Sequence, residues 1–363
     1  MEKDLGNRRI QRIGLGSYSI SLPKEWVEGT GLEKGNEVAL RAHDLSLIIA
    51  PRGINETKQL AENNCRKEYF VIVGPTDNTQ SVVRKINALY VVGADLIHVR
   101  FENGVSYEKH KVAISGVIKN DLLGSEIVYE SGDEIAIKTL VSHFKFPIER
   151  AIRRLAWIAL SMNKDTVLAA TKMDKDMLHR VVYAHYETKR LDLYIIRRLK
   201  LGIERNLLEE LGFETPKEYL GYRIATNIIK GIADYAVNIA NDTLAFETQI
   251  GTQIDSQKEP IDEDLLSAVF EFNSKARESF EDSLTALLKR DYKEADKILS
   301  ESPRDLVENS ILKALFDKRK DPRVFSIIKP IFDSSRRIME CGRDIAEVAL
   351  NRTVERNVAL ARA

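Results

Sequence analysis

Residues 8–27 read RRIQRIGLGSYSISLPKEWV, and this stretch decides the fold expected for the N-terminal region. Tyr18 and Ile20 alternate with serines, which is the period-two pattern of a half-buried strand. Pro23 stands where a helix can begin, so residues 24–30 are predicted to form a short helix. The stretch therefore predicts a strand that leads into two turns of helix.

A hairpin is predicted beyond this helix. Val38 and Leu40 show the same alternation, which resumes at Leu47 and Ile49 after a turn near His43. The N-terminal region would then contain four strands and one short helix. Because so small a unit buries little surface, we expect it to pair with a second copy.

Residues 10–51 resemble the AbrB/SpoVT-type DNA-binding domain, the swapped-hairpin barrel family that includes transition-state regulators and antitoxins. The resemblance lies in residues 14–16, 19–24 and 32–37, in Trp26, and in the closing residues 47–49. It implies an intertwined homodimer that lays its strands and loops on DNA through basic side chains.

The charges of this region agree with that implication. No Asp or Glu occurs from Leu5 to Lys24, and a dimer would double the cationic side chains into a two-fold basic surface. The alternative is a solvated face whose charges have no such partner. The candidate DNA-binding residues are Arg8, Arg9, Gln11, Arg12, Ser17, Tyr18 and Lys24.

The composition of the whole chain favours one localised contact surface. Its 363 residues contain 55 Lys and Arg against 55 Asp and Glu, so the chain is neutral and is not expected to coat nucleic acid along its length. Cys65 and Cys341 lie far apart, which argues against a disulfide framework or a zinc site and fits a reducing cytoplasm. No apolar run is long enough to insert into a membrane, so we expect a cytoplasmic protein.

A small α/β segment is predicted over residues 66–141. Strands are expected at 69–73, 96–101, 126–130 and 134–139, with one helix after Asn78 and another over 110–123. No motif in this segment is tied to chemistry. His98 alternates with Val99 along a strand, which favours a surface or packed histidine over a ligand.

Long helical patterns and an internal repeat follow. Residues 164–174 match 281–291 at an offset of 117, and residues 228–236 match 338–346 at an offset of 110. The closing helices resemble those of PhoU-type phosphate-uptake regulators, most clearly at residues 232–240. That resemblance implies two three-helix repeats, divalent or ferric ions bound by surface carboxylates, and a role linking phosphate status to transport or transcription. An AbrB-like head joined to PhoU-like repeats is similar to archaeal regulators of that family.

The carboxylates that such ions would need are incomplete here. Glu340 and Asp344 lie four residues apart and share one helix face, but Lys230 stands where the acidic partner of Asp234 is expected. These three carboxylates are the candidate metal ligands, with solvated surface side chains as the alternative. The basic run Arg197, Arg198 and Lys200 could meet a partner or phosphate, although a solvated helix face is the more ordinary interpretation.

The sequence thus predicts a multidomain α+β protein. Its parts are a swapped-hairpin β-barrel over 7–53, the α/β segment over 66–141, and an all-α bundle whose two three-helix repeats span 144–250 and 262–356.

No catalytic constellation is present, so we expect no enzyme. Two hypotheses remain open: a dimeric transcription regulator of phosphate uptake whose bundle is a sensor, or an adaptor that regulates a phosphate transporter or signalling protein and uses the head to dimerise. A toxin-docking antitoxin is less favoured, because about 310 residues in folded patterns follow the head.

Overall fold

The structure is a computed structural model that describes residues 6–14, 16–43, 46–51, 67–103, 105, 107–140, 146–250, 262–300, 306–318 and 321–357. The chain divides into two compact units, Met1–Lys67 and Glu68–Ala363. We call the first unit the head and describe each unit by itself.

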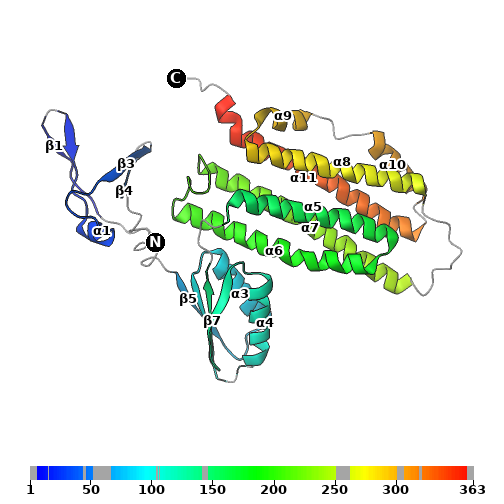
Figure 1. The fold of residues 1–363 in the computed structure, drawn as a ribbon, viewed down its shortest axis with the longest axis horizontal. Coiled ribbons are helices and arrows are strands. Elements are labelled where there is room, and N and C mark those ends of the chain that lie inside the picture. The colour runs from blue at the N-terminus through cyan, green and yellow to red at the C-terminus, as the bar shows by residue number, and fades with distance from the viewer. Residues whose placement is uncertain are drawn as a thin grey trace. The chain divides into compact units, whose positions relative to one another are not determined.

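The head consists of two hairpins and a short helix (Figure 1). Strands β1 (Gln11–Ile13) and β2 (Ser17–Ser19) pair antiparallel, and so do β3 (Val38–His43) and β4 (Ser46–Pro51). Helix α1 (Lys24–Gly29) begins directly after Pro23. It ends where the Thr30 hydroxyl donates to the carbonyl of Trp26 at 2.7 Å. The strand, helix and hairpin order predicted from the sequence is confirmed.

The apolar face expected on the second strand is not buried in a single chain. Tyr18 is 73% exposed and Ile20 is 48% exposed, and β2 is only three residues long. None of the head side chains whose burial is described is buried. The prediction of a half-buried strand is therefore wrong for the single chain, because none of the described head residues covers the hairpin.

A mixed four-stranded sheet begins the second unit. Its order is β5 (Glu68–Val73), β6 (Leu96–Phe101), β8 (Glu134–Thr139) and β7 (Ser125–Glu130), with β5 and β6 parallel and the other pairs antiparallel. Helices α3 (Thr79–Val91) and α4 (Tyr107–Asn120) follow the first two strands. Their apolar side chains join those of the sheet in one core.

Helix α4 begins three residues earlier and ends three residues earlier than predicted. It stops at Asn120 because the amides of Asp121 and Leu122 both return to the carbonyl of Val117, and Gly124 then takes a φ of +73°. Leu122 belongs to the buried core although it is not helical. The prediction over 110–123 had placed this residue inside the helix.

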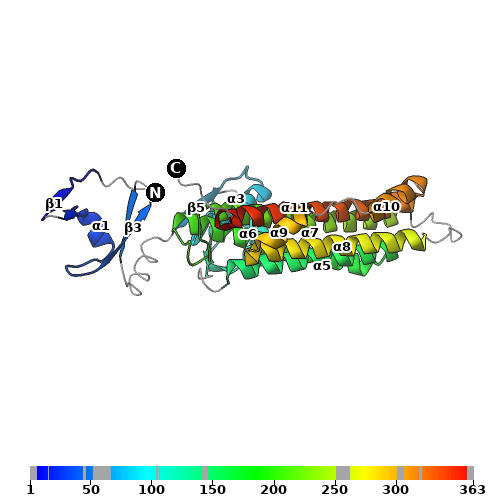
Figure 2. The same ribbon diagram turned by 90° about the horizontal axis from the view of Figure 1, so that it is seen from above.

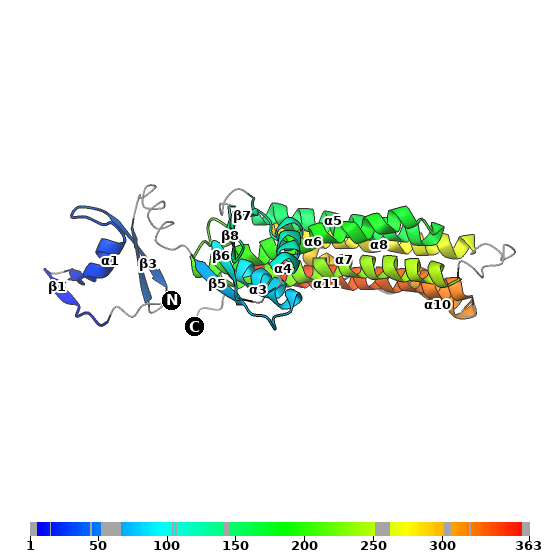
Figure 3. The ribbon, with the colours of Figure 1, turned by 90° about the horizontal axis from the view of Figure 1, so that it is seen from below.

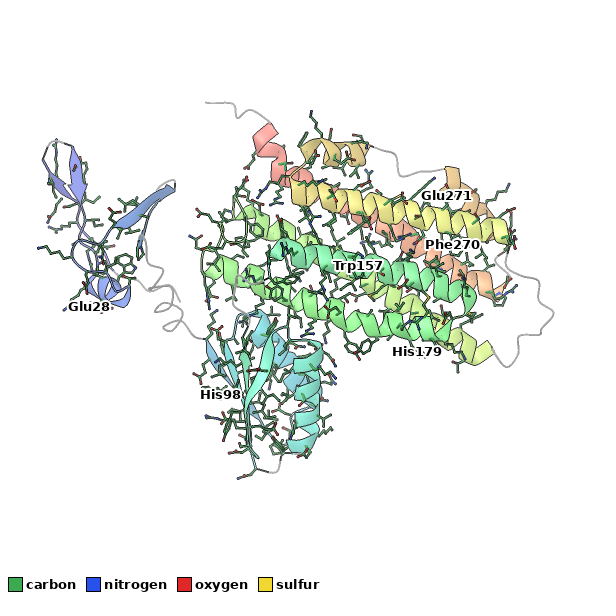
Figure 4. All side chains as sticks on the ribbon, in the orientation of Figure 1. Glu28, His98, Trp157, His179, Phe270 and Glu271 are labelled. Carbon is green, nitrogen blue, oxygen red and sulfur yellow. The ribbon has the colours of Figure 1, made fainter. Side chains whose placement is uncertain are left out.

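The face of the sheet opposite these helices is open to solvent. Phe70 is 52% exposed and Tyr129 is 55% exposed. His98, labelled on this face in Figure 4, lies 2.6 Å from Glu68 Oε1 through Nε2 and 2.5 Å from Glu134 Oε1 through Nδ1. Hydrogen bonding from His98 lowers the pKa of Glu134. The histidine is thus a half-buried surface residue, as the strand pattern indicated.

Long helices form the remainder of the unit. The first repeat contains α5 (Ile148–Lys172), α6 (Lys175–Glu204) and α7 (Lys217–Ile250). The second contains α8 (Glu263–Lys289), α9 (Tyr292–Ser300), α10 (Leu306–Asp317), the π-helical segment η1 (Val324–Ile328) and α11 (Lys329–Asn357). Figures 2 and 3 show α5 and α8 in one layer and α7 and α11 in the other. The helical fold with a repeat is confirmed, but two short helices take the place of one long middle helix in the second repeat.

The two repeats share a local feature that explains the 117-residue offset. Met173 directly follows α5 and Arg290 directly follows α8, and both residues adopt a left-handed φ of 55°. An aspartate follows each: Asp174 caps α6, and Asp291 accepts from the amide of Glu294 at the start of α9. The repeated sequence therefore encodes the same helix end and the same turn.

The basic run on α6 is largely buried, contrary to the interpretation of a solvated helix face. Arg197 is 4% exposed and Arg198 is 5% exposed. Arg197 Nη1 donates to the carbonyls of Tyr90 at 2.7 Å and Ala94 at 2.8 Å, and its Nη2 lies 3.4 Å from Asp95 Oδ1. These contacts attach the α/β segment to the helices.

Candidate functional site

The N-terminal hairpin brings four of the predicted DNA-binding residues together. Register places Arg12 opposite Tyr18, Gln11 opposite Ser19 and Ile13 opposite Ser17. Directly opposed residues lie close enough for their side chains to interact. Arg12 and Tyr18 are both exposed, so a cation and an aromatic hydroxyl stand side by side on an accessible ribbon.

The remaining candidates flank this ribbon in sequence. Arg8 and Arg9 are exposed and directly precede β1, and Arg8 Nη1 donates to the carbonyl of Asn7 at 3.0 Å. Lys24 opens α1 and forms an ion pair of 3.6 Å with Glu28, although the sequence had indicated an unopposed charge. Because both side chains are exposed, such a pair contributes only about 0.2–1 kcal/mol and does not prevent Lys24 from meeting a phosphate.

Asp234 on α7, a predicted metal ligand, already has a cation beside it. Its Oδ2 accepts from Lys230 Nζ at 2.6 Å, and its Oδ1 lies 2.8 Å from His185 Nε2. Asp192 on α6 is buried nearby, and burial raises the pKa of that carboxyl. The ammonium group of Lys230 therefore supplies the positive charge that a bound ion would bring.

The acidic pair of the second repeat is also partly neutralised. Glu340 accepts from Arg337 Nη1 at 2.8 Å, which raises the pKa of Arg337, and Asp344 lies one turn further along α11. Within the described ranges, no group of three or more His, Cys, Asp or Glu side chains is placed to hold a metal ion. The residues as they stand do not fit such an ion, because Lys230 and Arg337 already pair with two of the three candidate carboxylates.

Sequence reasoning also missed the surroundings of His185. Tyr183 is 71% exposed and Tyr186 is 48% exposed, so these rings are not buried between bundle helices. The burial of Arg197 could have been predicted from helical spacing. Tyr194 lies three residues before it and Leu201 four residues after it, and both are buried. Helical periodicity alone places Arg197 on the buried face.

Comparisons with known proteins give one family match in the head and one in the helical region. The PhoU domain family matches residues 152–243, from α5 into α7. The family described as antidote-toxin recognition MazE, bacterial antitoxin, matches residues 11–57 in the head.

The solved structures include a similar helical protein. The crystal structure of PhoU from Pseudomonas aeruginosa is 17% identical, covers 56% of this chain and 93% of its own, and superposes with a TM-score of 0.43. No curated protein matches the chain. Across the described residues, no helix is both long and apolar enough to cross a bilayer. The family matches confirm the resemblances drawn from the sequence, a head similar to MazE/AbrB-type domains and a helical region similar to the PhoU domain.

Proposed function

We propose that this protein is a dimeric DNA-binding transcriptional regulator, with its helical region sensing phosphate status or a partner of phosphate uptake. It would act in the cytoplasm and catalyse no reaction. The observation that carries the proposal is the head itself, which joins an exposed basic hairpin to apolar side chains that none of its described residues covers.

The apolar side chains of the head support pairing with a second copy. Ile10 is 69% exposed, Ile13 59%, Leu40 62% and Leu47 56%. A unit of this size cannot bury such side chains within itself, and exposed apolar surface of this kind marks an interaction site. A second head with the same surface would cover them, as in the swapped-hairpin family that the sequence resembles.

The charges of the head support DNA as the partner. Arg8, Arg9 and Arg12 lie within or beside one hairpin, and no Asp or Glu occurs from Leu5 to Lys24. Two copies would present six arginines. Phosphate contacts of this kind release counterions, so affinity should fall steeply as salt rises.

A second candidate is supported by the PhoU match. In this alternative the helical region would regulate a phosphate-transport or signalling protein, and the head would only dimerise. An archaeal source stays a prediction, and the proposal includes no metal ion at Asp234, Glu340 and Asp344, because the ion pairs of Asp234 and Glu340 do not suit one. The MazE description names toxin recognition, but the long helical region after the head favours DNA as the first partner to test.

Binding of fluorescent promoter fragments, pooled from the source genome, separates the two candidates. The test variant carries Arg8→Ala, Arg9→Ala and Arg12→Ala together. A matched control removes three exposed cations of α5 with Arg150→Ala, Arg153→Ala and Lys164→Ala. We expect the head variant to lose binding and the α5 variant to keep it. No binding by the intact protein, with and without phosphate, would favour the adaptor.

A further inference from the structure

The layer formed by α5 and α8 carries opposite charges on its two helices. The helices lie in one layer in Figures 2 and 3, and each is directly followed by a residue with the same left-handed φ. They therefore occupy equivalent places in the two repeats. The burial of every residue in both helices is described, so their exposed side chains can be compared.

The exposed side chains of α5 form a basic stripe around a tryptophan. Trp157 is 71% exposed, and Figure 4 labels it on α5. The other exposed positions lie three, four, seven or eight residues from their neighbours in the stripe, so they share one face of the helix. The cations of this basic stripe are Arg150, Arg153, Arg154, Lys164 and Lys172.

The exposed side chains of α8 form an acidic stripe. Figure 4 labels Glu271 on this helix. Lys275 and Lys289 are also exposed on α8, and Lys275 pairs with Glu271 at 3.0 Å, but the carboxylates outnumber these lysines. The carboxylates of this acidic stripe are Glu263, Asp264, Glu271, Glu278, Glu281 and Asp282. One repeat thus exposes cations on the helix whose equivalent in the other repeat exposes carboxylates.

Most of these charges have no ion-pair partner within one chain. Of the cations in the basic stripe, only Arg154 forms an ion pair with a described residue, Glu187 of α6, at 2.9 Å. In the described part of the chain, no cation pairs with Asp264, Glu281 or Asp282. Two stripes of opposite sign on one layer are self-complementary, which is what an isologous contact between two copies requires.

The heights of the charges along the two helices also correspond. Helices α5 and α8 run in opposite directions (Figure 1), and the side-chain amide of Asn273 donates to that of Asn163 at 2.9 Å. Lys164 lies one residue after Asn163, and Glu271 lies two residues before Asn273. Because both helices rise equally per residue, these two charges are level to within one residue.

We infer that the helical regions of two copies contact each other through these stripes. A two-fold axis that runs along the helices, midway between α5 and α8, places the basic stripe of each copy on the acidic stripe of the other. Lys164 then faces Glu271 of the second copy, and the same count of residues brings Arg153 to the height of Asp282. Trp157 lies between these two charge pairs, and a central aromatic side chain is typical of protein interfaces.

This contact rests on the proposed dimer. Exposed ion pairs hold two proteins together only weakly, so the stripes meet once the heads have joined two copies and raised their effective concentration. Loss of the contact should therefore leave the heads paired and able to bind DNA.

Charge reversal in two co-expressed full-length copies, one of them with a short tag, tests the contact. Arg153→Glu and Lys164→Glu make all four facing positions of one copy negative. Glu271→Lys and Asp282→Lys make those of the other copy positive. Like charges then oppose each other in either homodimer, whereas the mixed dimer restores both contacts. We expect native mass spectrometry to find about nine-tenths of the dimers mixed, against about half for random pairing.

A control pair of copies makes the same changes of net charge on other helices. One copy carries Lys200→Glu and Lys313→Glu, and the other carries Asp317→Lys and Glu347→Lys, all at exposed positions. This pair should mix at random, and an equal excess of mixed dimers in it would contradict the inference. Random mixing of the stripe variants would overturn the inference and leave the proposed dimer standing. A monomeric wild type would overturn both.

Discussion

Arg197→Met tests the contact that attaches the α/β segment to the helices. The carbonyl of Ala94 loses the guanidinium donor of Arg197, which costs about 2 kcal/mol for a buried acceptor. The carbonyl of Tyr90 still accepts from the amide of Gly93, so losing the Arg197 hydrogen bond there costs only about 1 kcal/mol. Losing the cation–π contact with Tyr90 adds about 1 kcal/mol.

Part of this loss is recovered in the variant. Burial lowers the pKa of Arg197, which shows that the folded state disfavours its charge, and Met removes that charge while filling the space of the side-chain stem. The expected net loss in the free energy of unfolding is therefore about 2–3 kcal/mol.

Urea unfolding measures the loss, and amide hydrogen exchange shows where it falls. We expect faster exchange in α3, which contacts α6, while α8 and α11 stay protected. Lys200→Met removes an exposed cation from the same helix and should change stability by less than about 0.5 kcal/mol. An Arg197→Met variant as stable as Lys200→Met, with unchanged exchange in α3, would refute this reasoning.

Three further predictions follow from burial, backbone geometry and exposure. Burial raises the pKa of Asp192, so the charged carboxylate destabilises the folded state increasingly as the pH rises above the pKa of Asp192 in the unfolded chain. In urea unfolding, Asp192→Asn should therefore gain more stability over the wild type at pH 7 than at pH 4. Gly93 has a φ of +95° and a Cβ there would clash with a leucine side chain, so Gly93→Ala should cost more than about 1 kcal/mol in thermal unfolding, whereas Gly116→Ala should stabilise α4. In light scattering, Leu40→Glu in the head should convert a dimer to a monomer, whereas Leu312→Glu, at an exposed position of α10, should not.

Local signals in the sequence predicted much of the fold. The Asn78 side chain caps α3 by accepting from the amide of Gln80 at 2.8 Å, and the predicted bounds of the strands at 96–101 and 134–139 are those observed. Each of these elements is specified by residues within a few positions of it. The same holds for α1, which starts after Pro23.

Features set by distant residues could not be predicted in this way. The ion pair between Lys230 and Asp234 follows from helical spacing, but the contact of His185 with Asp234 needs α6 and α7 to be packed together. Likewise, the ion pair between Arg352 on α11 and Glu218 on α7 needs helices from different repeats to meet in space. The candidate DNA-binding residues were found because they lie close together in sequence.

The central claim, that the head binds DNA, is tested most directly by the salt dependence of the dissociation constant for a bound promoter fragment. If the three arginines of each head in a dimer contact phosphates, these six contacts should contribute about −5 to the slope of log affinity against log salt concentration. We predict that the Arg8, Arg9 and Arg12 triple variant loses most of that slope. An unchanged slope in this variant would contradict the claim.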